Sequence, residues 1–176
     1  MNQAVDPIAN PSAYQQSLLA ALGGDDPAVA QATTPAAFRA LVAEAGLLLR
    51  VRPEPNEWSV LECIDHLVDG ELVTATRYRW VLAEDRPDIV GYDQDLWVAR
   101  LHDGEDPETL LTLFEALRRS SLELWARTPV ADRVRFGLHR ERGPESYELI
   151  FRLAAGHDRV HLGQARRTLE QVRGSG

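Results

Sequence analysis

The sequence predicts an all-α protein, built as one four-helix bundle, and three observations lead to this fold class. Apolar residues recur at helical spacing over four long stretches. Pairs that favour helix starts, such as Asn10-Pro11 and Asp106-Pro107, precede such stretches. No stretch alternates between apolar and polar residues with the period of a strand, so no sheet is expected. A chain of 176 residues is most simply a single domain over residues 1–176, with flexible ends at 1–9 and 174–176.

The first arm of the bundle is predicted in two pieces. Asn10 caps a helix that runs to Leu22 and ends at Gly23-Gly24, because glycine commonly follows the end of a helix. A second start at Thr34-Pro35 opens an apolar segment that continues to about residue 49. The Gly-Gly-Asp-Asp-Pro sequence between the pieces predicts a turn.

The other three arms have clearer boundaries. Ser59 and Glu62 are spaced as a capping box, which predicts a helix over residues 59–84. Asp106-Pro107 opens a helix over 106–128, and Pro144 opens the last helix, over 144–172. The connection between the second and third arms, residues 85–104, is long enough to cross the bundle. Part of it, at 93–101, is expected to form a short helix.

Composition excludes several classes of function. The formal net charge of −8 argues against a broad nucleic-acid-binding face. No apolar run approaches the length of a membrane span, and no signal peptide is recognisable, so a soluble cytoplasmic protein is expected. The single cysteine, Cys63, allows no internal disulfide, and its position favours a small core residue over a ligand or nucleophile.

Two histidines in the last predicted helix indicate a metal site. His157 and His161 are four residues apart, which places them on one helix face roughly 6 Å apart along the axis. They share that face with Ile150 and Leu153, so the imidazoles lie on the side expected to face the core. A buried polar group without a partner costs about 1–3 kcal/mol, and one metal ion would satisfy both imidazoles.

Several short motifs, in their order along the chain, resemble the DinB/YfiT-like family of helical bundles. The resemblance extends from about Trp58 to Gln164. Its parts are Trp58-Ser59, Asp65-His66-Leu67-Val68-Asp69, Arg77-Tyr78-Arg79, Glu84-Asp85-Arg86-Pro87, Tyr92-Asp93-Gln94-Asp95-Leu96-Trp97 and Gly156-His157-Asp158-Arg159-Val160-His161-Leu162-Gly163-Gln164. The Tyr-Asp-Gln-Asp-x-Trp segment is most similar to the YfiT branch of the family.

The resemblance implies a DinB-like bundle that binds one divalent metal ion per chain. The ligands it implies are His66 from the second helix and His157 and His161 from the last. Imidazole nitrogens suit several divalent metals, and zinc or nickel is the prediction. Such proteins are commonly homodimers, so a homodimer is expected as well.

The resemblance also implies an enzyme, either a metal-dependent hydrolase or a bacillithiol-type thiol S-transferase. A metal with three protein ligands keeps a position at which water or a low-molecular-weight thiol is activated, and the three histidines do not discriminate between these. The expected partner is then a small-molecule substrate, with no nucleic acid and no membrane. The alternative is a metal-binding, stress-associated interaction protein without catalysis.

Other polar residues of the sequence have different expected positions relative to this site. Asp69 and Gln164 each lie one helical turn from a histidine and are candidates to orient the ligands or the metal-bound water. Asp65 and Asp158 point about 100° away from the ligands and are expected at the surface. An ion pair with Asp93 or Asp95 is expected for Arg77, in preference to anion binding. His102 and His139 are expected in exposed loops, and His139 is the better candidate to enter the site.

Overall fold

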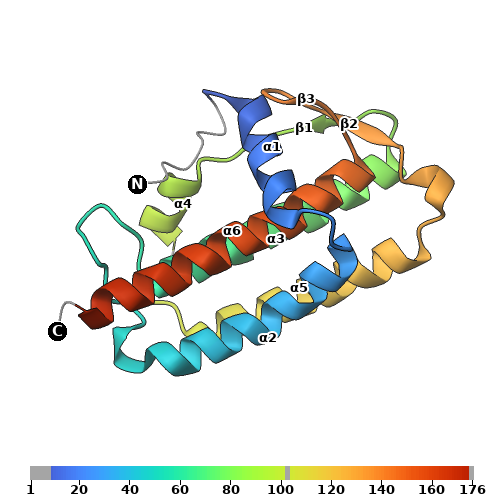
Figure 1. Ribbon diagram of the computed structural model, residues 1–176. Coiled ribbons are helices and arrows are strands. Elements are labelled where there is room, and N and C mark those ends of the chain that lie inside the picture. The colour runs from blue at the N-terminus through green and yellow to red at the C-terminus, as the bar shows by residue number, and fades with distance from the viewer. Residues whose placement is uncertain (1–8, 102–103, 175–176) are drawn as a thin grey trace.

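Four long helices form the body of the protein. The computed structural model describes residues 9–101 and 104–174. The long helices are α2 (Pro27–Ala45), α3 (Val60–Ala83), α5 (Pro107–Arg127) and α6 (Tyr147–Gly174). Both α3 and α2 contact α5 and α6, which closes a four-helix bundle (Figure 1). The predicted fold class is confirmed.

Shorter elements cover the bundle. Helix α1 (Pro11–Leu22) crosses α6 instead of continuing the arm formed by α2 (Figure 1). The predicted short helix in the crossover connection is present as α4 (Gln94–Leu101), which contacts α3. Single turns of 3₁₀ helix follow α2 (η1, Gly46–Leu48) and α5 (η2, Val130–Asp132). The ends predicted to be flexible lie outside the described residues, except for Ala9 and for Gly174, which is the last residue of α6.

Capping side chains set the predicted helix starts. The hydroxyl of Ser59 accepts a hydrogen bond from the Glu62 backbone amide at 3.2 Å, and the Glu62 carboxylate accepts one from the Ser59 amide at 2.8 Å. This completes the capping box that the sequence predicts for α3. Asn10 and Asp106 cap α1 and α5 in the predicted positions. These bonds satisfy amide groups that have no partner within the helix.

The predicted start of the second helix was wrong by two turns. Helix α2 begins at Pro27, where Asp26 accepts hydrogen bonds from two backbone amides, and Pro35 lies inside the helix. A proline there removes the amide that would bond to the carbonyl four residues earlier, that of Gln31. The guanidinium of Arg118 donates to this carbonyl instead, at 3.1 Å. A long-range contact therefore allows Pro35 to lie inside a helix, although the sequence pattern predicts a helix start there.

A small three-stranded sheet at one end of the bundle was not predicted. Its strands are β1 (Asp88–Ile89), β2 (Phe136–His139) and β3 (Gly143–Ser146). β1 pairs with β2 in parallel, and β2 pairs with β3 antiparallel, with Leu138 opposite Pro144. Strands of two and four residues are too short to show alternation in the sequence. Pro144 consequently lies in β3 instead of opening the last helix, and α6 begins at Tyr147.

The apolar core fills the space between the long helices. Phe38 and Phe114 meet edge to face across α2 and α5 with ring centroids 6.0 Å apart. Cys63 belongs to this cluster and is fully buried, as predicted. Burial raises the pKa of its thiol to about 12, so it is neutral at physiological pH. In the described part of the chain, no helix combines the length and the apolar character that a membrane span requires.

A buried ion network joins the four long helices. The guanidinium of Arg118 on α5 donates to Glu71 on α3 at 3.1 Å and forms a two-pronged pair with Asp158 on α6. Thr34 on α2 also donates to Asp158, at 2.8 Å. The prediction that Asp65 and Asp158 lie at the surface was wrong, since they are 1% and 3% exposed. Helix periodicity assigns one inward face, whereas α6 is covered on several sides by α1, α2 and α3.

Helices α1 and α6 are in backbone contact at Gly156. A Cβ atom at this position would lie only 2.0 Å from the carbonyl oxygen of Leu18. Leu18 and Leu22 of α1 are buried beside this crossing. The absence of a side chain at Gly156, immediately before His157, is therefore what allows α1 to lie across α6.

Candidate metal centre

Three histidines from two neighbouring helices meet at one point of the bundle. His157 and His161 lie one turn apart on α6, and His66 faces them from α3. One ring nitrogen of each lies within 4.8 Å of the others. Within residues 9–101 and 104–174, no other group of three or more His, Cys, Asp or Glu side chains converges in this way. His66 is buried, while His157 and His161 are half-buried.

The two closest ring nitrogens have the spacing of ligands that share one metal ion. The Nε2 atoms of His66 and His157 are 3.0 Å apart. Ligand bonds of about 2.0–2.1 Å to one ion place neighbouring nitrogens roughly 3 Å apart, so the donor set suits a divalent metal. Nδ1 of His161 lies 2.9 Å from Oε1 of Gln164. Because the amide oxygen can only accept, the imidazole proton is on Nδ1, and Nε2 keeps the lone pair for a ligand bond.

The environment keeps these imidazoles neutral. Burial, reinforced by the neighbouring His161 and His66, holds the pKa of His157 well below its usual range. Burial also lowers the pKa of His161 to about 4, although its bond to Gln164 acts in the opposite direction. Neutral imidazole is the form that binds metal, so His157 and His161 are ready for ligation at neutral pH.

Trp58 forms an apolar wall on one side of the three histidines. Its ring centroid lies 5.1 Å from that of His66 and 6.2 Å from that of His161, with the second pair nearly parallel. Trp58 precedes the cap of α3, so the capping box also fixes this ring against the site. Apolar contact with two imidazoles restrains their orientation and excludes water from that side.

The opposite side of the site is polar. The space that a Cβ would fill at Gly70, one turn after His66, lies 3.5 Å from Cε1 of His157 and 3.6 Å from the hydroxyl of Tyr92. Burial raises the pKa of Tyr92, and the nearby Asp69 raises it further. Asp69 is therefore close to this wall and is 7% exposed, while its role in orienting a ligand stays a prediction.

Sequence reasoning did not single out Tyr92 as a neighbour of the site. Its position depends on how residues 85–104 fold back over α3, which periodicity does not reveal. The one available signal is Gly70, a residue without a side chain on the same face of the helix as His66. That pattern indicates the close approach of another segment.

His139 is not in an exposed loop, contrary to the prediction. It is the last residue of β2 and is 4% exposed, with Nδ1 2.9 Å from a carboxylate oxygen of Glu141. Burial and the charge of Arg142 lower its pKa to about 4. The strand pairing that buries it was missed together with the sheet. His139 does not belong to the three-histidine group, and His102 lies outside the described residues.

Arg77 does not form the ion pair predicted for it. Its Nη2 donates to the backbone carbonyl of Val90 at 2.8 Å, and Asp93 instead accepts a hydrogen bond from the Leu96 amide, at the start of α4. The side chain of Arg77 is 8% exposed. Asp93 lies at a helix cap, so its carboxylate is used locally.

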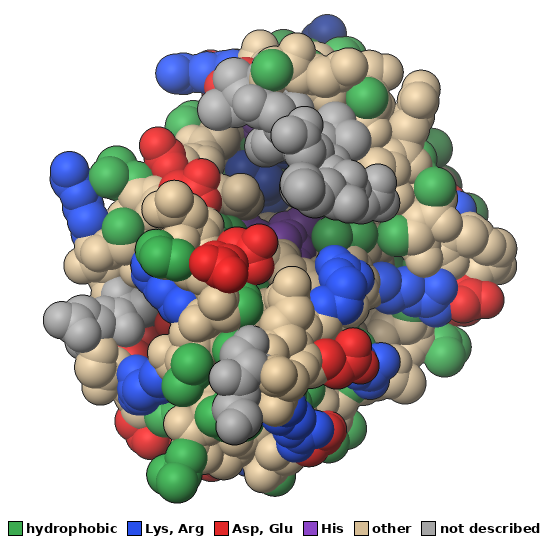
Figure 2. All heavy atoms as spheres, turned by 60° about the vertical axis from the view of Figure 1, so that its left-hand side comes forward, with side chains coloured by type: hydrophobic (Ala, Val, Ile, Leu, Met, Phe, Trp, Pro, Cys, Tyr) green, Lys and Arg blue, Asp and Glu red, His purple; other side chains and the backbone are tan. Residues whose placement is uncertain are grey.

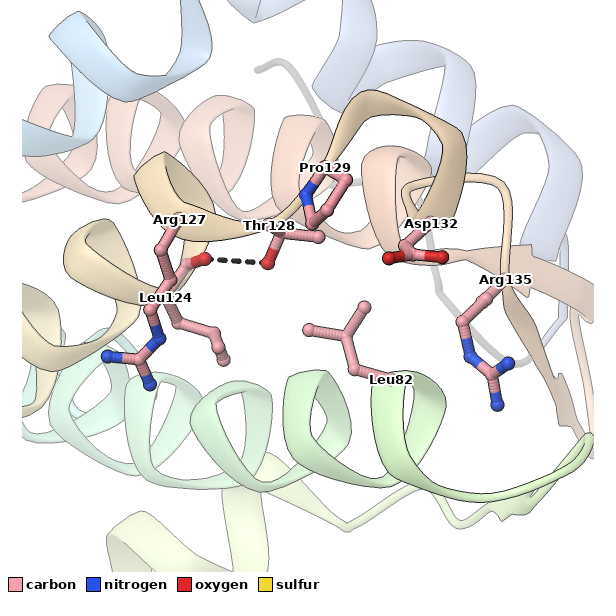
Figure 3. A pocket seen from close by; sticks show the side chains of 7 residues that line it. All are labelled: Leu82, Leu124, Arg127, Thr128, Pro129, Asp132 and Arg135. Atoms are coloured by element: carbon pink, nitrogen blue, oxygen red, sulfur yellow. Dashed lines mark hydrogen bonds between the residues drawn. The ribbon is translucent and has the colours of Figure 1, made fainter.

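A pocket of about 360 Å³ lies elsewhere on the protein, between the end of α3 and the η2 turn (Figure 3). In Figure 3, Leu82 points into the pocket while Arg127 and Arg135 stand at its two ends. Leu82 is sixteen residues after His66, which corresponds to roughly 24 Å along α3. Two polar residues that line the pocket bond to backbone carbonyls: Thr128 bonds to Leu124, and Arg135 bonds to Val81 and Glu84. We therefore place the candidate site at the histidines.

The histidines can be reached from solvent. Figure 2 shows histidine and arginine side chains inside one hollow of the molecular surface. The half-buried state of His157 and His161 agrees with this view. The arrangement can therefore admit a small molecule to the side of the site that Trp58 leaves open.

Comparison with known proteins gives the family. The model of the DinB superfamily matches residues 29–165. A protein of Oceanobacillus iheyensis named "Putative metal-dependent hydrolase" is 32% identical over 106 residues, which cover 60% of this chain and 61% of the relative. A protein of the same name from Bacillus cereus is 28% identical over 105 residues, covering 59% and 60%. The chain thus spans about three fifths of these curated relatives.

A solved structure gives the same fold. YfiT from Bacillus subtilis, described as a probable metal-dependent hydrolase with an unusual four-helix bundle topology, superposes with a TM-score of 0.74. The superposition covers 99% of this chain and 93% of YfiT at 18% sequence identity, so it concerns the fold alone. The family match, by contrast, spans most of the chain and includes all three histidines. This chain belongs to the DinB superfamily.

Proposed function

We propose that this protein is a metal-dependent enzyme whose three-histidine centre activates water or a low-molecular-weight thiol for reaction with a small substrate. The observation that carries the proposal is the convergence of His66, His157 and His161 within 4.8 Å. The names of the relatives from Oceanobacillus iheyensis and Bacillus cereus support metal-dependent hydrolysis. Zinc or nickel is the proposed metal, because both accept imidazole ligands.

Different residues around the three histidines have different proposed roles. The three imidazoles would hold the ion, Gln164 fixes the ring of His161, and Trp58 shields one side. A metal with three protein ligands supplies an open position and lowers the pKa of a bound water to about 7. The polar side near Tyr92 is then the side from which a substrate approaches.

The single cysteine does not supply the nucleophile. Cys63 is fully buried in the core, and burial raises its pKa to about 12, which excludes it as a thiolate. Water and a thiol cosubstrate are the two sources that the proposal includes. The described surroundings of the three histidines fit both.

Metal content tests the ligand set directly. The purified protein should contain about one zinc or nickel ion per chain, and His161→Ala should lose it, because only two imidazoles would remain. His139→Ala is the matched control, a buried histidine outside the group, and it should keep the full metal content. Elemental analysis of dialysed protein measures both, with circular dichroism to confirm folding. Full metal content in His161→Ala would refute the ligand assignment.

Turnover tests catalysis separately. Metal-loaded protein should hydrolyse a member of an ester, amide and phosphoester panel, or transfer a thiol to an electrophile, at a rate that falls to background in His161→Ala. Product formation is measured with and without added thiol, which distinguishes the two nucleophiles. If metal-loaded protein gives no turnover with any pair, the non-catalytic metal-binding alternative is correct.

Gln164 should tune metal affinity without contributing a ligand. Gln164→Ala removes the oxygen that accepts the His161 proton, and we expect zinc affinity to fall by roughly 10–100-fold. Gln164→Glu keeps an acceptor and should restore most of the affinity. Gln171→Ala, an exposed position two turns further along α6, is the control. Competition with a chelating dye gives the affinities, and an unchanged value for Gln164→Ala would show that other contacts orient His161.

A further inference from the structure

Two buried arginines in this protein have opposite surroundings. The guanidinium of Arg118 is bound by two carboxylates and one carbonyl. Arg77 is 8% exposed, yet its one hydrogen bond to a described residue is to the neutral carbonyl of Val90. Its Nε atom is buried without a hydrogen-bond partner, and no carboxylate of the described ranges 9–101 and 104–174 pairs with it.

An unpaired buried guanidinium requires an explanation. Arginine stays charged in proteins and carries five donors in a planar fork that matches an oxyanion. Buried charges are normally paired, because removing a charge from water is unfavourable unless a counter-ion compensates it. Burial lowers the pKa of Arg77, whereas the pKa of Arg118 is raised by its two carboxylates. Within residues 9–101 and 104–174, Arg77 thus has no bonded anion of the kind that Arg118 has.

Arg77 lies on the same face of α3 as His66, three turns further along the helix. It is on α3, seven residues after Gly70, which corresponds to two turns on the same face and roughly 10 Å along the axis. The Tyr92 hydroxyl and Cε1 of His157 both border the Cβ position of Gly70, and Tyr92 is close enough to Arg77 for each to affect the other's pKa.

The groups around Arg77 do not neutralise it. Glu145 is the carboxylate with the strongest influence on its pKa, and Glu145 already accepts hydrogen bonds from Arg142 at 2.6 and 3.1 Å and from Gln15 at 2.7 Å. His139, whose pKa Arg77 lowers, has a second buried nitrogen, Nε2, without a partner. The backbone at 90–92 brings these groups together, because Arg77 bonds to Val90 and the side chain of His139 adjoins Gly91.

We propose that Arg77 binds a carboxylate group of the substrate of the three-histidine centre, with His139 and Tyr92 beside it. This rests on the proposed function and narrows its substrate to small molecules that carry a carboxylate remote from the reacting group. The planar carboxylate matches the free edge of the guanidinium and would supply a negative charge in direct contact with it, which no described residue does. Arg77 then positions the substrate, while the histidines act at its other end.

Nuclear magnetic resonance of the arginine Nε–H groups tests the proposal on the metal-loaded full chain. Titration with sodium acetate or sodium succinate should shift the Arg77 Nε–H signal in a saturable way, and inorganic phosphate should bind more weakly. Arg77→Gln should weaken succinate binding by about 10-fold or more, since a charge-assisted hydrogen bond is lost. Arg79→Gln is the matched control: Arg79 lies on the same helix, is exposed and bonds only to Ala75 and Ser120.

Several results would overturn the assignment. Unchanged succinate affinity in Arg77→Gln, or phosphate binding in preference to both carboxylates, excludes a carboxylate site at Arg77. Arg77→Met should melt within roughly 2 °C of the wild type, because no ion pair is lost. A decrease comparable to that of Arg118→Met would make Arg77 a structural residue.

The proposed function and the carboxylate site can fail separately. Arg77→Gln should keep its metal content, and loss of the metal in this variant would contradict a role confined to substrate binding. His161→Ala should still bind succinate at Arg77. This expectation does not depend on whether the wild type contains a metal. Conversely, the Arg77 Nε–H signal of the metal-loaded wild type could remain unchanged with every carboxylate. That result would refute this inference and leave the proposed function intact.

Discussion

Gly156→Ala is expected to lower the free energy of unfolding by about 2–5 kcal/mol. The added methyl group would lie 2.0 Å from the carbonyl oxygen of Leu18, so α1 has to move away from α6. Complete undocking exposes Leu18 and Leu22, at about 1.5–3 kcal/mol each, which sets the upper limit. The better helix propensity of alanine stabilises the helix by about 1 kcal/mol and offsets part of this loss. Steric overlap with backbone outweighs this gain, because backbone cannot rotate away as a side chain can.

Gly163→Ala is the matched control for this prediction. Gly163 is on the same helix, one turn beyond Val160, and its added Cβ would meet only the mobile end of Arg167, at 3.3 Å. We expect an unchanged or slightly increased stability there, by up to about 1 kcal/mol. Urea unfolding followed by circular dichroism gives both values. If Gly156→Ala were as stable as Gly163→Ala, the backbone contact between α1 and α6 would not exist in solution.

Arg118→Met is expected to destabilise the protein by about 3–5 kcal/mol. The substitution leaves Glu71 and Asp158 buried without their counter-ion and removes the donor to the Gln31 carbonyl. A buried charge that loses its partner lowers the stability more than lost packing does. Methionine keeps most of the side-chain volume of arginine, so the effect on packing should be small. Thermal and urea unfolding should both show the loss.

Two further variants separate the buried charges from general effects of arginine removal. Arg39→Met removes two ion pairs between α2 and α5, but at the surface, where solvent screens them, so the change should be small. Combining Arg118→Met with Glu71→Gln and Asp158→Asn removes the uncompensated charges and should recover part of the stability. No recovery in the triple variant would mean that packing, and not charge, explains the effect of Arg118→Met.

The parts of the fold that depend on local chemistry could be predicted from the sequence. Ser59 with Glu62, and Asp106 with Thr109, satisfy amides within their own helical turn, so the pattern is visible without the rest of the chain. The start of α2 was missed because Pro35 is compatible with a helix interior only through Arg118, 83 residues away. The sheet was missed because its pairing joins strands from distant parts of the sequence.

In the candidate site, too, local patterns could be predicted from the sequence, whereas burial by distant elements could not. His157 and His161 are recognisable from spacing alone, and His66 was identified by resemblance to a family. The burial of Asp158 and His139 could not be predicted, since it is created by other elements packing around them. Asp69, Gln164 and the expected homodimer stay predictions, although the hydrogen bond of Gln164 to His161 supports its proposed role.

Pro35 also has a consequence for how the protein folds. Because the carbonyl of Gln31 depends on a donor from α5, the middle of α2 gains its full stability only after the two helices have met. An isolated α2 segment should therefore be poorly helical, and the transition state for folding should already contain the contact between α2 and α5. The same arginine holds Asp158, the neighbour of His157, so the event that completes α2 also fixes the segment of α6 that carries two of the three histidines.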